Sequence, residues 1–181
     1  MAKLKDFDYD KFKKMKPPKD NSLETFKEIQ SINKLRQDEK FVNDHDDIYD
    51  VYIAVVGKDD DDQIKKLINE SRPIIKKLKN YFNRPRPKKL AKNFGIQLKD
   101  IELESTKTPS YPSGHSTQGY LVAEMLKDKY PNKVKELDKK AKDISESRNI
   151  ARAHLKSDSE LGKKLGLDMA KHLKGNVWKQ N

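Results

Sequence analysis

Apolar residues recur along most of the chain at the three- and four-residue spacing of helices that pack by one face. The first such pattern follows Asn21, where Glu24 completes a helix-start signal. A second capping-box pattern pairs Ser157 with Glu160. The predicted helices cover 21–35, 48–56, 61–81, a segment starting after Gly114, 132–154, and a last segment from 157 to about 173. We therefore predict an all-α fold, with Pro73 kinking or dividing the third helix.

Prolines mark where helical structure should stop. Pro85 and Pro87 remove amide donors and bias the preceding residues toward extended geometry, so a loop is expected from there to residue 112, with ambiguous structure over 93–102. The lysine-rich start contains Pro17 and Pro18 and should form an irregular arm that lies over the domain or frays. The predicted organisation is an arm at 1–20, one helical domain at 21–175 and a C-terminal tail at 176–181.

Composition narrows the class of protein. The 181 residues include no cysteine, which excludes disulfides and thiolate metal sites. The apolar run Val51–Val56 is far shorter than the ~20 residues of a membrane-spanning helix. The first residues have no apolar segment like that of a secretory signal, so we expect cytoplasmic residence without a membrane span.

The net charge of +11 favours anionic partners. Most lysines are scattered beside acidic residues on predicted helices, as over 133–140. This arrangement is typical of a solvated surface, and it argues against a nucleic-acid partner.

Three clusters carry candidate chemistry: Lys79 with Arg86, Ser113-Gly114-His115, and Arg148 with His154 and Asp158. A phosphoryl group carries spread negative charge, and a catalyst needs fixed cations and amide donors directed at it. Lys79, Arg86 and Arg148 supply the cations, and a guanidinium can bind phosphate through two hydrogen bonds. Ser113 can donate its hydroxyl, and Gly114 lets the backbone approach an anion where a helix is expected to begin.

A nucleophile must come from histidine, serine or a carboxylate, because cysteine is absent. His154 is the best candidate, since Asp158 follows four residues later and could hold one ring nitrogen in a helical turn. His115 would then protonate the leaving alcohol. Asn43–Asp47 contains His45 among acids, but such a run more often caps a helix or remains solvated, and we expect neither a metal nor a cofactor.

Together the three clusters resemble the signature motifs of the type 2 phosphatidic acid phosphatase superfamily, which includes class A bacterial acid phosphatases and vanadium-dependent haloperoxidases. The class A enzymes match best, and the likeness extends from the Pro17–Ser22 opening to residue 172. The resemblance implies a single-domain helical bundle of this type, and it suggests self-association. It also implies a phosphohistidine at His154, oriented by Asp158, with His115 as proton donor and later as base.

Two registers fit the first motif, because Lys77 to Arg84 has the same spacing as Lys79 to Arg86. We favour Lys79 and Arg86, since the intervening aromatic residues and arginine resemble class A enzymes. Residues 151–155 depart from the pattern of these enzymes, which leaves substrate preference open.

The predicted activity is hydrolysis of small phosphomonoesters by an acid phosphatase. The alternatives are a vanadate-dependent haloperoxidase that uses the same pocket and a basic nucleic-acid-binding module in which the site is a relic.

Overall fold

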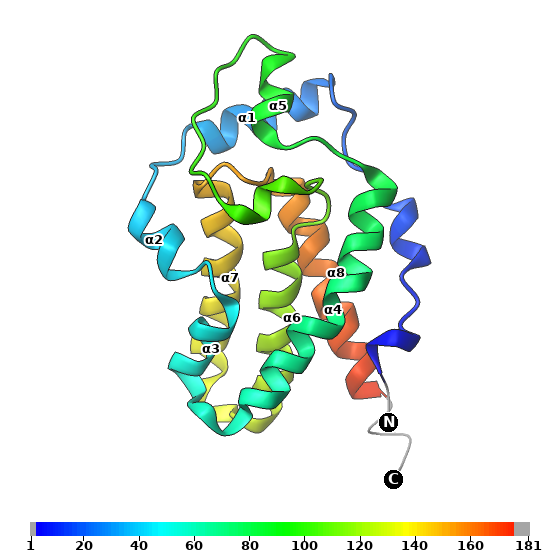
Figure 1. Ribbon diagram of the computed structural model, residues 1–181, viewed down its shortest axis with the longest axis vertical. Helices are drawn as coiled ribbons and strands as arrows, with labels where there is room; N and C mark the ends of the chain where they lie inside the picture. The colour runs from blue at the N-terminus through cyan, green and yellow to red at the C-terminus, as the bar shows by residue number, and fades with distance from the viewer. Residues whose placement is uncertain (1–2, 176–181) are drawn as a thin grey trace.

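The regular structure of residues 3–175, which the computed structural model describes, is helical and contains no strand in that range (Figure 1). The all-α prediction is therefore confirmed. The 176–181 tail lies outside the described residues. The helices are α1 (Leu23–Asn33), α2 (Glu39–Asp44), α3 (Ile48–Val56), α4 (Asp61–Phe82), α5 (Pro87–Lys92), α6 (Gly114–Lys129), α7 (Val134–Ile150) and α8 (Lys156–Gly175). Among the described residues, no helix combines the length and apolar character needed to cross a membrane.

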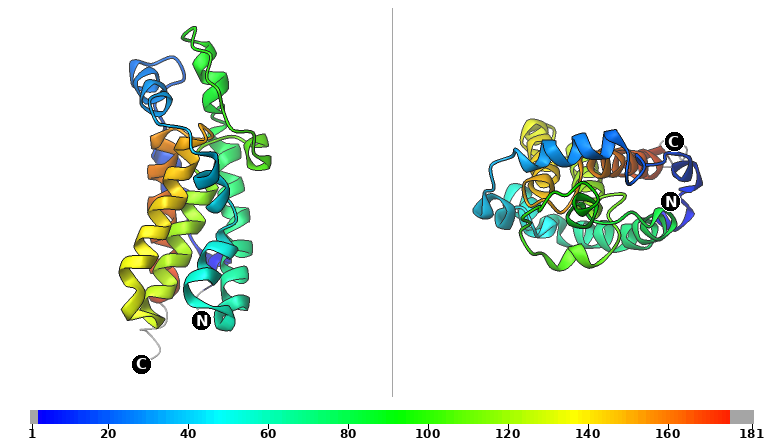
Figure 2. Two further views of the ribbon diagram at one scale, coloured as in Figure 1. Left: turned by 90° about the vertical axis from the view of Figure 1, so that its left-hand side faces the viewer. Right: turned by 90° about the horizontal axis from the view of Figure 1, so that it is seen from above.

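The longer helices α4, α6, α7 and α8 run along the long axis of the molecule, while α1 and α5 lie at one end (Figures 1 and 2). At that end α4 and α7 finish, and α6 and α8 begin. Figure 1 also shows the segment that joins α5 to α6 passing over this end. All three sequence clusters therefore come together at one end of the bundle, although nearly eighty positions of sequence separate the first from the last.

Apolar stripes on these helices form the core as the spacing predicts. Ile64, Leu67, Leu78, Leu121, Leu165 and Met169 are all buried. On α1 the predicted apolar residues Ile29 and Ile32 are buried. Leu23 is 65% exposed, because it lies in the first turn, beyond the packed face. The N-terminal segment lies over the bundle in two 3₁₀ turns, Leu4–Asp6 and Asp10–Lys14, and it buries Leu4 and Phe12.

Helices α6 and α8 approach so closely that their backbones are in contact. A Cβ atom added at Gly162 would lie 2.7 Å from the Ser113 carbonyl oxygen. At Gly166 it would lie 2.3 Å from the Thr117 carbonyl oxygen. Real Cβ atoms do not approach oxygen this closely, so only glycine fits at both positions. This packing holds the start of α6, which carries Ser113 to His115, against the first turns of α8, which carry Asp158.

Two short helices were not predicted. Helix α5 begins at Pro87, where the sequence predicted a loop, because proline at the first helical position loses no internal hydrogen bond. Helix α2 begins after Asp38, whose side chain accepts a hydrogen bond from the Phe41 amide.

Two predicted helix ends were wrong. Helix α7 ends at Ile150 rather than at His154. Helix α8 begins at Lys156, and the Ser157 hydroxyl donates to Glu28 instead of forming a capping box. Helix α4 is continuous through Pro73, so the proline does not divide it. The site is therefore built partly on a turn between helices, since His154 lies between α7 and α8.

Candidate active site

A tight turn between α7 and α8 presents His154. Arg152 adopts a left-handed conformation with a φ of 57°, which reverses the chain directly after the helix. The Arg148 carbonyl then accepts hydrogen bonds from the amides of Ala153, at 3.0 Å, and His154, at 3.3 Å. The Asn149 side chain donates to the His154 carbonyl at 2.9 Å. The backbone of His154 is thus fixed on both sides of the residue.

The two ring nitrogens of His154 face different partners. Nδ1 lies 3.4 Å from Oδ2 of Asp158, and Nε2 lies 3.0 Å from Nη1 of Arg86. A guanidinium can only donate, so Nε2 must offer its lone pair, and in the neutral ring Nδ1 carries the proton. This is the tautomer that a nucleophilic imidazole needs, with the free lone pair directed at the cationic side of the site.

Burial and neighbouring positive charges keep the His154 ring neutral. Only 3% of the residue is exposed. Burial lowers the pKa of His154 well below its usual value, and the charges of Arg86 and Lys79, followed by those of His115 and Arg148, lower it further. All four charged neighbours belong to the set predicted from the sequence, so the fold gathers these side chains around one imidazole.

Asp158 lies in a buried network that the sequence did not predict. Its Oδ1 accepts from Nη1 of Arg84 at 2.8 Å, and its Oδ2 accepts from the Leu155 amide at 2.8 Å. Arg84 is 2% exposed and also contacts Glu28 and Ser157. Burial raises the pKa of Asp158, and the charge of Arg84 opposes that rise. We expect Arg84 to keep the carboxylate ionised and fixed beneath His154.

The two candidate registers of the first motif separate in space. Lys79 is buried near the end of α4, and its Nζ donates to the Pro109 carbonyl at 2.8 Å. Arg86 donates to His154 and to the carbonyls of Ser105 and Thr108. Lys77 instead points outward, with its Nζ 5.6 Å from the centroid of the Tyr9 ring. The pair beside the imidazole is therefore Lys79 and Arg86.

Ser113 and Gly114 form the start of α6. Ser113 is fully buried, and its Oγ accepts from the Ser116 amide at 3.2 Å, which leaves the hydroxyl proton free to donate to a ligand. Its amide donates to the Asp158 carbonyl at 3.0 Å, which joins the second cluster to the third. A Cβ at Gly114 would meet Lys79 Cε only at 3.9 Å, so space alone does not demand glycine there.

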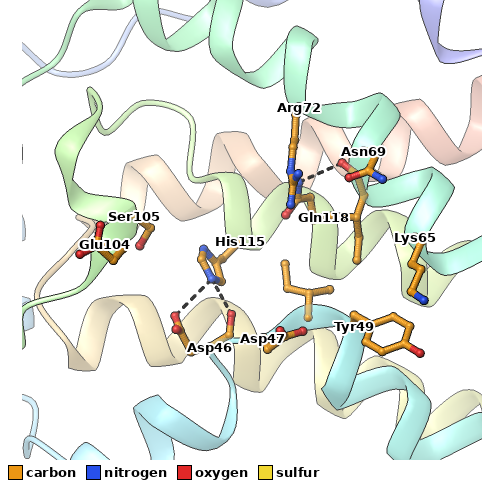
Figure 3. Close-up of a pocket in the computed structure, with 12 residues that line it drawn as sticks. Asp46, Asp47, Tyr49, Lys65, Asn69, Arg72, Glu104, Ser105, His115 and Gln118 are labelled. Atoms are coloured by element: carbon orange, nitrogen blue, oxygen red, sulfur yellow. Dashed lines mark hydrogen bonds and ion pairs between the residues drawn. The ribbon is translucent and has the colours of Figure 1, made fainter. Parts of the chain in front are cut away.

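His115 and Arg148 meet around Asp46, a residue that no sequence motif singled out. Nε2 of His115 lies 2.8 Å from the Asp46 carbonyl oxygen and 3.4 Å from its Oδ1 (Figure 3). Arg148 is fully buried and donates to the same Oδ1 at 2.9 Å. The hydrogen bond from His115 and the charge of Arg148 lower the pKa of Asp46 to about 2, although desolvation opposes the shift. A carboxylate thus lies between two groups that were predicted to face phosphate.

A cavity of about 430 Å³ opens beside His115, on the side where α3 and α4 face α6 (Figure 3). Ser105 and Glu104, from the segment that passes over the end of the bundle, line it next to His115. Further lining residues include Tyr49, Lys65, Arg72 and Gln118. Substrate atoms next to His115 would therefore have room to extend between α3 and α4.

The deprotonation of Lys79 should limit activity at high pH. Burial, followed by the charge of Arg86, lowers the pKa of Lys79 to about 7. Above that pH the amine is neutral and attracts phosphate weakly, so we expect kcat/KM to fall as pH rises through about 7 for 4-nitrophenyl phosphate, whose leaving group needs no proton. Lys79→Arg should remove this limb, because a guanidinium stays protonated. The test compares the pH profiles of kcat/KM for the wild type and Lys79→Arg. If the decrease at high pH is unchanged in Lys79→Arg, a group other than Lys79 causes it.

Comparison with known proteins finds curated relatives of one kind. The curated relatives found for this chain are non-specific acid phosphatases. The enzyme from Salmonella typhimurium is 35% identical over 88 residues, which make up 49% of this chain and 35% of that protein. The enzyme from Salmonella typhi is 34% identical over 88 residues, with the same coverage. The matched region thus spans about a third of the relatives' length, and no protein-family model matches the chain.

Proposed function

We propose that this protein hydrolyses phosphate monoesters through a phosphohistidine on His154, with His115 as general acid and then base. The observation that supports this most directly is the His154 ring, whose protonated Nδ1 faces Asp158 while its Nε2 lone pair faces Arg86. The names of the two relatives support the same class of activity, phosphoric monoester hydrolysis. Their description as non-specific favours a broad range of substrates.

In the first step the Nε2 lone pair of His154 attacks phosphorus, and the bond from phosphorus to the ester oxygen breaks. His115 gives its proton to the departing alkoxide, which leaves as the alcohol. The Nδ1 proton of His154 stays on the ring and is held by Asp158. In the second step a water molecule attacks phosphorus and gives a proton to His115, the phosphorus–nitrogen bond breaks, and inorganic phosphate leaves.

The cations around His154 would stabilise the phosphoryl group during both steps. Arg86 lies on the side that Nε2 faces, the charge of Lys79 also acts on the ring, and the amides at the start of α6 add a favourable helix dipole. In the structure Arg86 donates to Nε2 itself, so a bound phosphoryl oxygen would take over that hydrogen bond. The leaving oxygen would likewise replace the Asp46 carbonyl as the partner of His115.

Hydrolysis of 4-nitrophenyl phosphate by the purified protein tests this proposal. We expect turnover that persists in a chelator and that vanadate inhibits. His115→Ala should lower kcat/KM, which reports the steps up to departure of the alcohol, by ~10²–10⁴-fold for an alkyl phosphate, because the alkoxide then leaves unprotonated. The loss should be smaller for 4-nitrophenyl phosphate, whose leaving group needs no proton. An equal loss for both esters would show that His115 does not act as the acid.

A further inference from the structure

The cavity beside His115 is suited to hold the alcohol part of a substrate, and we call it the leaving-group cavity. In the proposed reaction His115 passes its proton to the ester oxygen, so the atoms attached to that oxygen must lie next to its ring. The cavity of about 430 Å³ that His115 lines is large enough for a small alcohol. The assignment of this cavity to the alcohol part of the substrate rests on the proposed function, because only that reaction places an ester oxygen beside His115.

Most charged groups that line the leaving-group cavity already have a partner. Lys65 forms an ion pair with Asp61 at 2.9 Å. Asp46 is engaged by Arg148 and His115. Two further acids of the lining are also occupied, since Glu104 pairs with Lys107 at 2.8 Å and Asp47 caps α3 by accepting from the Asp50 amide.

Arg72 differs from these groups, because it forms no ion pair with any residue between 3 and 175. Figure 3 shows its side chain extending from α4 toward the space between His115 and Gln118. The cavity therefore has one uncompensated cation on the wall opposite α3. A guanidinium in this setting favours a carboxylate or a phosphate, which can accept two of its hydrogen bonds.

The position of Arg72 along the bundle sets the size of the ligand. Gln118 follows His115 by one turn of α6, a rise of ~5 Å. Its side-chain amide donates to the Ser71 hydroxyl at 3.2 Å, and Ser71 is the direct neighbour of Arg72. Residue 72 thus lies on α4 beside the turn of α6 that follows the turn of the proposed acid. Two or three carbon atoms between the ester oxygen and a second charged group would span such a separation.

We propose that the leaving-group cavity selects phosphate monoesters of short alcohols that carry a second anionic group, which Arg72 binds. This second group is a compact anion, either a carboxylate or a second phosphate. Arg72 would then determine specificity, while His154 and its surrounding cations act on the phosphoryl group common to all substrates.

Two matched pairs of esters test this proposal. Glycerate 3-phosphate and glycerol 3-phosphate differ by a carboxylate in place of a hydroxymethyl group. Propane-1,3-diol bisphosphate and 3-hydroxypropyl phosphate test a phosphate in the same way. We expect kcat/KM to favour the anionic member of at least one pair by about tenfold, the scale of a charged hydrogen bond. The pair that shows the preference identifies the anion.

In Arg72→Gln the ratio within that pair should fall to about one, because the anionic ester loses its partner. Lys76→Gln is the matched control, since it removes one exposed positive charge from the next turn of α4 without lining the cavity, and it should keep the preference. Equal hydrolysis within both pairs by the wild type, or a preference that survives in Arg72→Gln, would overturn this inference alone. Failure to hydrolyse any of the esters would instead refute the proposed function, and this inference with it.

Discussion

Replacing His154 by alanine should lower phosphatase activity by ~10⁴-fold or more, the scale seen when a nucleophile that works with a fixed partner is removed. The reason is that the lone pair of His154 Nε2, 3.0 Å from Nη1 of Arg86, is the nucleophile of the proposed reaction. Steady-state hydrolysis of 4-nitrophenyl phosphate measures the loss. Thermal unfolding measured in parallel would separate lost chemistry from lost structure.

His172→Ala provides the matched control for that experiment. His172 lies near the end of α8, where its Nε2 bonds to the Lys3 carbonyl oxygen, at the opposite end of the helix from Asp158. The variant should keep wild-type activity. If His154→Ala retained a tenth of the wild-type rate while staying folded, another group would have to be the nucleophile.

Replacing Arg84 by methionine should destabilise the protein by ~3–5 kcal/mol, the cost of leaving one member of a buried ion pair without its partner. Asp158 is fully buried and would keep the Leu155 amide and the 3.4 Å contacts from the Ser110 hydroxyl and from Nδ1 of His154, but no cationic partner as close as Arg84. Glu28 and Ser157 would lose a partner as well. Urea unfolding at pH 7 gives the free energy directly.

Arg36→Met is the control for Arg84→Met, because Arg36 is exposed and its replacement should change the unfolding free energy by less than ~0.5 kcal/mol. The activity of folded Arg84→Met should also fall, since an Asp158 carboxyl that gains a proton no longer accepts the His154 Nδ1 proton. A loss below ~1 kcal/mol would mean that Arg84 and Asp158 are much better hydrated than their burial indicates.

The long helices could be predicted from the sequence because each buries a continuous apolar stripe. Helix α4 shows this best: Ile64, Leu67 and Leu78 repeat at helical spacing and are buried. Helix α4 also continues through Pro73, because packing of the apolar stripe along the whole helix outweighs the single hydrogen bond that proline removes. The short helices α2 and α5 have no stripe of that length, and their start signals are one aspartate and one proline.

Local chemistry could be predicted for the motif residues but not for their partners. His154 and Asp158 were paired on a spacing of four residues in a helix, whereas the structure joins them across the start of α8. The two side chains therefore lie together as predicted, but not within one helix. Arg84 was weighed only as an alternative to Arg86, and Asp46 only as part of an acidic run. Their roles in the site were missed because these come from contacts with residues 74 and 102 positions away. Contacts with the buried side chains of Asp158 and Arg148, which only the fold supplies, distinguish these two residues from other charged residues.

The central claim is that His154 takes the phosphoryl group, and trapping the intermediate tests it most directly. Protein mixed with a phosphate ester and quenched in alkali within milliseconds should carry an acid-labile phosphoryl group, which peptide mass spectrometry should locate at His154. Phosphate on no residue, or on a residue other than His154, would contradict the account.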